Sequence, residues 1–125
     1  MKISELSQYI LDNISDYDPF TYSEASEICE DFINDAILYD KDLETTDDIN
    51  ISNLEDQIHE YADGLVDIYY SDIYASASKF SDSVEDARDE GLLAGDESLD
   101  KQIQVGQYQA YYSLLSQVVD LIRDL

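Results

Sequence analysis

The chain has 125 residues, 44% of them hydrophobic, and its 30 Asp and Glu against 6 Lys and Arg give a formal net charge of −24. This length is enough to bury one hydrophobic core, so we expect a single domain over residues 1–125. The charge excludes direct binding of DNA or RNA, because Lys and Arg are needed to neutralise phosphates.

The apolar residues recur at helical spacing, and only one Pro and four Gly interrupt the chain. A high net charge is typical of disordered chains, but disordered acidic segments lack such a regular apolar register. We therefore predict an all-α, compact protein of four to five helices, with one long central helix and a strongly acidic surface.

In the N-terminal half, helices are predicted over residues 4–14, 21–39 and 52–80. Pro19 separates the first two, because proline disfavours helix at the residue before it. The segments TYSE (residues 21–24) and SNLE (residues 52–55) have the form of capping boxes and are expected to begin the second and third helices. Gly64 is a weak point in the third helix, where it costs about 1 kcal/mol relative to Ala.

In the C-terminal half, a short helix and a turn at Gly95 are predicted, and Ser98 is expected to begin a last helix that runs to the C-terminus. Residues 3–78 hold 20 acids and one base, Lys41, whereas residues 101–119 hold no acid. A neutral helix suits either a buried central position or a dimer seam. Its candidate residues for either role are Gly106, Ala110, Tyr111 and Leu114.

The residues that usually carry catalysis or bind metals are scarce. Cys29 lies in an apolar register, which indicates a buried structural thiol. His59 is the single histidine, so a zinc site lacks a second His or Cys ligand. The best EF-hand register begins at Asp16 but has Phe20 and Thr21 at the fifth and sixth positions, and so it fails. We predict no catalytic residue, cofactor or metal site. With no signal peptide and no run of about 18 apolar residues, we expect a soluble, cytoplasmic protein.

The charge and size instead match those of a short DNA duplex. Duplex DNA carries about one negative charge per 1.7 Å of axis, so 24 charges correspond to about 40 Å, or about 12 base pairs. Acids recur at three- and four-residue steps along the second and third helices, where like charges each cost a few tenths of a kcal/mol. Halophilic adaptation would also acidify a surface and remains an alternative. The candidate phosphate-mimicking acids are Glu24, Glu27, Asp31, Asp35, Asp47, Asp48, Asp56, Glu60, Asp63, Asp67 and Asp72.

One stretch, LEDQIHEYADGLVDIYYSDIY (residues 54–74), contains the pattern L-x-D-x-I-H-x-x-x-A-D-x-x-V-x-x-Y-Y-x-D-I. This pattern resembles the central helix of the Ocr antirestriction proteins of tailed bacteriophages. The match covers about twenty of the 125 residues. The matching residues are Leu54, Asp56, Ile58, His59, Ala62, Asp63, Val66, Tyr69, Tyr70, Asp72 and Ile73.

The resemblance implies a phage-encoded homodimer in the host cytoplasm that imitates bent DNA, occupies the DNA-binding groove of type I restriction-modification enzymes and blocks restriction and methylation. It also implies that Asp56, Asp63 and Asp72 imitate phosphates. The family has a strongly acidic C-terminal tail, whereas this chain ends in SQVVDLIRDL, so the dimer interface does not transfer. The alternatives are a DNA mimic of another target, such as a CRISPR effector, a repair glycosylase or a nucleoid protein, and an acidic adaptor or low-affinity cation buffer.

Overall fold

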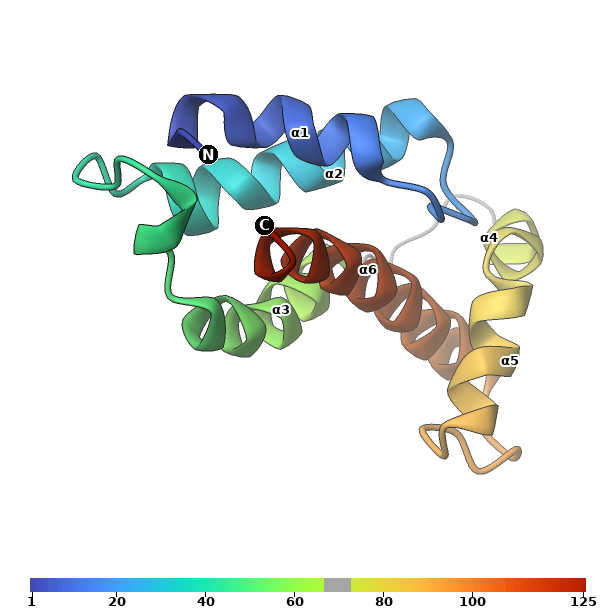
Figure 1. Cartoon of the computed structure of the whole chain (residues 1–125). Helices are drawn as coiled ribbons and strands as arrows, with labels where there is room; N and C mark the ends of the chain where they lie inside the picture. Colours follow the sequence, from blue (N-terminus) through green and yellow to red (C-terminus); the bar gives the residue numbers. More distant parts are fainter. Residues whose placement is uncertain (67–72) are drawn as a thin grey trace.

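The structure, a computed structural model, describes the backbone of residues 1–66 and 73–125 and the side chains of residues 1–66 and 76–125 (Figure 1). Within these residues the chain forms six α-helices and no strand, which confirms the all-α prediction. The α-helices are α1 (Leu6–Asn13), α2 (Tyr22–Ile33), α3 (Ile51–Leu65), α4 (Ile73–Lys79), α5 (Ser81–Asp89) and α6 (Leu99–Arg123).

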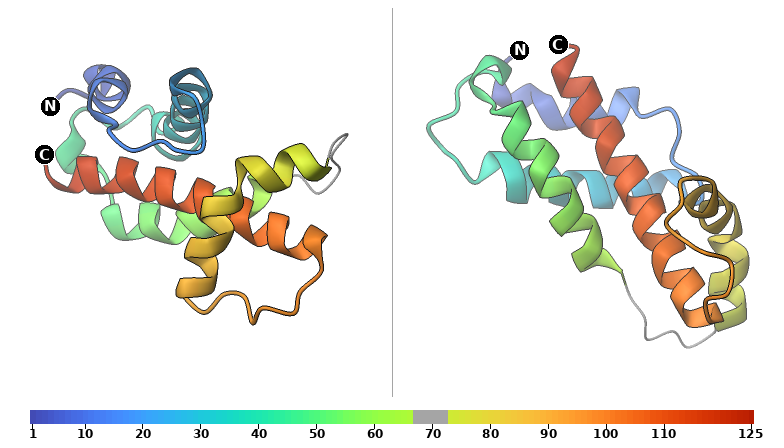
Figure 2. Two further views of the ribbon diagram at one scale, coloured as in Figure 1. Left: turned by 90° about the vertical axis from the view of Figure 1, so that its right-hand side faces the viewer. Right: turned by 90° about the horizontal axis from the view of Figure 1, so that it is seen from below.

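The helices are arranged around α6. In the view of Figure 1, α1 and α2 run side by side above α3 and α6, and α5 crosses α6 near its N-terminal end. Figure 2 shows from below that α3 and α6 also run side by side. Among the described residues α6 contacts each of the other five α-helices. The long central helix is therefore the last one, and not the helix expected over residues 52–80.

The main hydrophobic core lies between α1, α2, α3 and α6. Leu6 and Ile10 of α1, Phe32 of α2, and Leu115 and Val118 of α6 are fully buried there. Burying a side chain of this size contributes about 1.5–3 kcal/mol. The amphipathic register read from the sequence thus accounts for which face of each helix is buried.

A smaller core lies between α5 and α6, around Val84, Ala87 and Leu93. Gly106 permits the close approach of the two helices there. A Cβ atom added to Gly106 would lie 2.5 Å from Cγ2 of Val84 and 3.3 Å from the carbonyl oxygen of Phe80. A glycine at this position of α6 is therefore what the packing of α5 requires.

Several predicted helix signals are confirmed. Thr21 and Glu24 form the capping box of α2: Thr21 Oγ1 accepts from the Glu24 N–H at 3.2 Å, and Glu24 Oε1 accepts from the Thr21 N–H at 3.0 Å. The predicted extent of this helix, to residue 39, is completed by a π-helical segment, η2 (Asn34–Leu38). Ser98 caps α6 through the Lys101 N–H, and Gly95 has a φ of +106° in the turn before it.

The prediction for the third helix is wrong at both ends. Asn50, and not Ser52, is its N-cap and accepts from the Asn53 N–H at 3.1 Å. The helix ends at Leu65, and Val66 is extended with a ψ of 124°. The low helix propensity of Gly64 favours an end at this point. Residues 67–72 lie outside the described part of the chain, and α4 follows as a separate helix, so the described residues hold six α-helices where four to five were predicted.

The first helix also begins differently from the prediction. Ser4, at the predicted start of this helix, where its side chain was expected to form the cap, lies instead in a short 3-10 turn, η1 (Ile3–Glu5), that precedes α1. The Ile3 N–H donates to the carbonyl oxygen of Glu44, which ties the N-terminus to the loop before α3. That loop contains a second 3-10 turn, η3 (Thr46–Asp48). None of the helices in the described ranges is long and apolar enough to cross a membrane.

Candidate partner-binding surface

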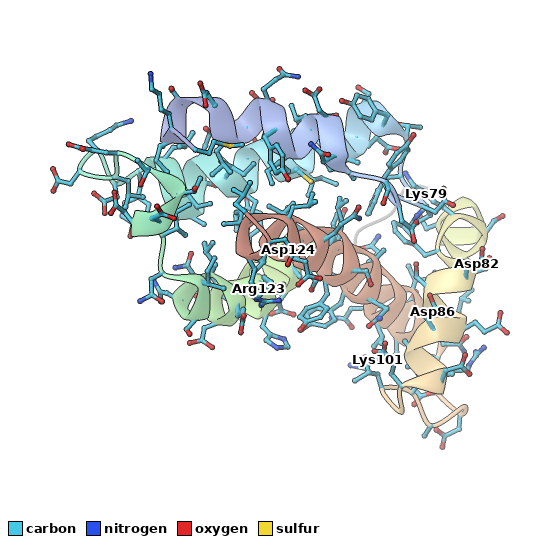
Figure 3. The ribbon with its side chains drawn as sticks, viewed as in Figure 1. Lys79, Asp82, Asp86, Lys101, Arg123 and Asp124 are labelled. Carbon is cyan, nitrogen blue, oxygen red and sulfur yellow. The ribbon has the colours of Figure 1, made fainter. Side chains whose placement is uncertain are left out.

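The acids lie at the surface of the described part of the chain. No Asp or Glu is buried among the side chains that the structure describes. Three acids form ion pairs within that part: Glu24 pairs with Lys79, whereas Glu55 and Asp120 both pair with Arg123. Figure 3 shows both bases, Lys79 beside the end of the α1–α2 connection and Arg123 at the C-terminal end of α6. Most of the negative charge is thus free of a compensating base.

The outer face of α3 carries three of the predicted acids. Asp56, Glu60 and Asp63 follow one another at steps of four and three residues, which places them on one side of a helix. All three are exposed, whereas Leu54 and Ile58 of the same helix are buried against the core. None of the three carboxylates makes a hydrogen bond or ion pair with a residue that the structure describes. This face is therefore an uncompensated row of negative charge.

Tyr61 of α3 contacts the end of α2 and the η2 segment that follows it. The Tyr61 hydroxyl donates to Oδ2 of Asp35 at 3.2 Å, and its ring packs edge-on against Phe32 with centroids 5.2 Å apart. Burial, followed by the hydrogen bond and charge of Asp35 and the charge of Asp31, raises the pKa of Tyr61 to about 12. Tyr61 thus links α3 to Asp35 of η2, and the charge of Asp31 also acts on its hydroxyl. Glu27, one turn before Asp31, is exposed and makes no pairing within the described residues.

Two of the predicted acids hold the fold together instead. Glu24 accepts from the Thr21 N–H and from Lys79 Nζ at 2.9 Å, and the Thr21 bond first, then Lys79, lowers the pKa of its carboxyl. Asp48 accepts from the backbone N–H groups of Glu44 and Thr45, both at 3.3 Å. Carboxylates that are already hydrogen-bonded within the chain are less free to imitate a phosphate, since a new partner has to compete with these bonds.

The remaining acids complete the set. Asp47 is exposed beside Asp48. Asp67 and Asp72 lie outside the residues whose side chains the structure describes, as do Tyr69 and Tyr70 of the matching pattern. Among the predicted acids, Asp31 and Asp35 therefore lie near Tyr61, and Asp56, Glu60 and Asp63 share the outer face of α3.

The candidate seam residues of α6 are used within the chain. Gly106, Ala110 and Leu114 are buried against neighbouring helices, and Tyr111 stacks on Phe20 with ring centroids 5.1 Å apart. Of the two roles left open by the sequence, these contacts favour the core helix.

An aromatic cluster beside the α3 acids was missed by the sequence reasoning. His59 stacks against Tyr108 and Tyr112 of α6, and its Nδ1 is hydrogen-bonded to the Tyr108 hydroxyl. Burial, then the neighbouring Tyr112 and Asp63, raises the pKa of Tyr108. No local signal could have found this cluster, because His59 and Tyr108 are 49 residues apart in the chain.

Neither a reactive cysteine nor a metal site finds support in the described residues. Burial raises the pKa of Cys29 to about 12, so its thiol stays protonated at neutral pH. Within residues 1–66 and 73–125, no group of three His, Cys, Asp or Glu side chains could hold a metal ion. No family model, curated protein or solved structure matches the chain.

Proposed function

We propose that the protein is a DNA mimic, a non-catalytic inhibitor that occupies the DNA-binding groove of a host defence enzyme. The favoured target is a type I restriction-modification enzyme, whose restriction and methylation activities would both be blocked. The exposed carboxylates take the place of DNA phosphates, and no cofactor takes part.

The observation that carries this proposal is the uncompensated row of acids on α3. Asp56, Glu60 and Asp63 repel one another at a cost of a few tenths of a kcal/mol per pair. A Lys at one of these positions would relieve the repulsion, yet the chain places none there. Such a face attracts a basic groove, and complementary charge raises the rate of association as well as selecting the partner.

The choice of target rests on the resemblance of residues 54–74 to the Ocr antirestriction proteins. On the same ground we propose a phage-encoded homodimer that acts in the host cytoplasm. Because Gly106, Ala110 and Leu114 are buried within one chain, a dimer would have to use other residues.

The proposal is tested by capture of a purified type I restriction-modification enzyme on the immobilised protein. We expect retention at low salt, elution as the salt concentration rises, and displacement by a duplex of about 12 base pairs or longer. A single-stranded oligonucleotide of equal charge is the control and should displace the enzyme less well. Binding that is insensitive to salt and to duplex DNA would refute the mimic, and stoichiometric calcium binding by calorimetry would favour a cation buffer.

A further inference from the structure

A small polar pocket lies where the connection between α1 and α2 meets α5 and α6. Its volume is about 140 Å³, well below the roughly 300 Å³ at which pockets for drug-sized ligands begin. It is therefore of a size for one side chain or a small ion. The polar residues that line it include Asp16, Asp18, Ser83, Asp86, Gln109 and Gln117.

The wall formed by the α1–α2 connection is fixed to α6 by Gln117. Its Oε1 accepts from the backbone N–H groups of Ser15 at 2.8 Å and Asp16 at 3.3 Å, and its Nε2 donates to the carbonyl oxygen of Asp16 at 2.7 Å. Phe20, near the end of the same connection, stacks on Tyr111 of α6. The pocket is thus built by contacts between distant parts of the chain.

One of the residues that line the pocket, Gln109 of α6, has an amide without a partner in the described part of the chain. Gln109 is 7% exposed, and its carboxamide makes no hydrogen bond with any residue in the described part of the chain. The contrast with Gln102 on the same helix is clear, because that side chain accepts from Arg88 and donates to the carbonyl oxygen of Glu97. Among the described residues, Ser26 Oγ is the one fully buried side-chain N or O atom without a hydrogen bond, so the unpaired amide of Gln109 is open to the pocket, where a ligand can bond to it.

The charge around the pocket is negative only. Asp16, Asp18 and Asp86 line it together with hydroxyl and amide groups, and no Lys or Arg does so. Lys79 is engaged by Glu24 and Arg88 by Gln102. The complementary ligand is a cation that donates several hydrogen bonds in different directions.

We infer that this pocket receives the guanidinium group of an arginine side chain presented by a protein partner. A guanidinium is planar, carries five N–H donors and is less strongly hydrated than an ammonium. Its donors point in several directions and match the kinds of acceptor that line the pocket, namely carboxylates, hydroxyl groups and the carbonyl oxygen of Gln109. A metal ion fits less well, since the described acids form no group of three that could hold one. That the arginine belongs to the DNA-binding groove of a target enzyme rests on the proposed function.

The pocket is tested without the target, by titrating the isotope-labelled protein with Nα-acetyl-arginine amide and recording NMR spectra. The side-chain amide signals of Gln109 and the backbone signals of Ser83 and Asp86 should shift in a saturable way. The matched probes are Nα-acetyl-lysine amide, which should bind at least about threefold more weakly because it has fewer donors, and calcium chloride, which should not compete at equal concentration.

Two variants on α5 distinguish arginine binding in the pocket from attraction of arginine by the negative charge of the whole protein. Asp86→Asn should weaken arginine binding about tenfold, as expected for loss of a charge-assisted hydrogen bond. Asp82→Asn removes the same charge one turn earlier on the same helix, outside the pocket lining, and should leave the affinity nearly unchanged (Figure 3). Circular dichroism checks that both variants remain folded.

Equal responses to the arginine and lysine probes, equal losses in the two variants, or displacement of the arginine probe by calcium would overturn the inference. If a target is captured in competition with DNA but the titration shows no preference for arginine, the inferred arginine site is refuted and the proposed function is not. Arginine binding without any DNA-competed target would support the pocket and count against the proposed function.

Discussion

The helices α3 and α6 run side by side, yet they treat charge in opposite ways. The outer face of α3 presents Asp56, Glu60 and Asp63 without a paired base, whereas residues 101–119 of α6 contain no acid. α6 contacts every other α-helix in the described part of the chain, and acids there would lose their hydration on burial. The comparison separates two demands on the sequence: α6 is selected for packing, while the outer face of α3 carries a charge pattern that packing and helix stability do not require.

The largest effect should come from shortening a core side chain of α6. Leu115 is fully buried, so Leu115→Ala should lower the free energy of unfolding by about 2–5 kcal/mol, through lost burial and the cavity left behind. Leu125→Ala is the control, because Leu125 is 45% exposed. Urea unfolding followed by circular dichroism measures both variants. A loss below about 1 kcal/mol for Leu115→Ala would contradict the central position of α6.

A smaller effect is expected from the two helical glycines, one on each of these helices. Gly106→Ala places a Cβ 2.5 Å from Val84 Cγ2, and overpacking of this kind costs about 1–3 kcal/mol. Gly64→Ala meets no atom within 4 Å and should gain up to about 1 kcal/mol from helix propensity. The two substitutions should therefore shift the thermal unfolding midpoint in opposite directions. Equal stabilisation by both would show that α5 does not press against Gly106.

The smallest effect concerns the ion pair between Glu24 and Lys79. Glu24→Gln keeps a capping acceptor but removes the charge, and it should cost about 0.5 kcal/mol at neutral pH, because solvent screens these partly exposed side chains. The pKa of Glu24 is lowered in the folded state from its ordinary 4.5. Its charge therefore stabilises the fold above pH 4.5, and this contribution is lost as the pH falls through the lowered value.

Urea unfolding of wild type and Glu24→Gln across this pH range measures the change. The difference between the two proteins should shrink in acid. A difference that stays constant down to the lowest pH at which the protein remains folded would show that the ion pair contributes no stability.

Much of the fold could be predicted because its signals are local. The capping box of Thr21 and Glu24, the cap at Ser98 and the turn at Gly95 each depend on residues within three positions of one another. The early end of α3 was missed, since Gly64 signals a weak point without saying whether packing will carry the helix past it. Asn50 and Ser52 are both good caps, and the sequence alone did not choose between them.

The candidate surface was only partly predictable for the same reason. Periodicity placed Asp56, Glu60 and Asp63 on one exposed face. It could not foresee that Glu24 would be paired with Lys79, 55 residues away, or that Tyr61 would bind Asp35. The unpaired amide of Gln109 was equally hidden, because a Gln within the acid-free residues 101–119 looks like any other neutral residue until its surroundings are known.

The central claim is that the α3 acids serve a partner rather than the fold. Its most direct test compares a triple variant, Asp56→Asn with Glu60→Gln and Asp63→Asn, with a control triple, Glu5→Gln with Asp42→Asn and Asp124→Asn. Both remove three charges from exposed sites, and the affinity for a purified type I restriction-modification enzyme is measured for each at several salt concentrations. We expect the α3 variant to keep or slightly gain stability. It should lose about tenfold in DNA-competed affinity, which corresponds to about 0.5 kcal/mol for each of three exposed charge contacts. Its affinity should also depend less steeply on the salt concentration. Unchanged affinity, or an equal loss in both triples, would contradict the claim.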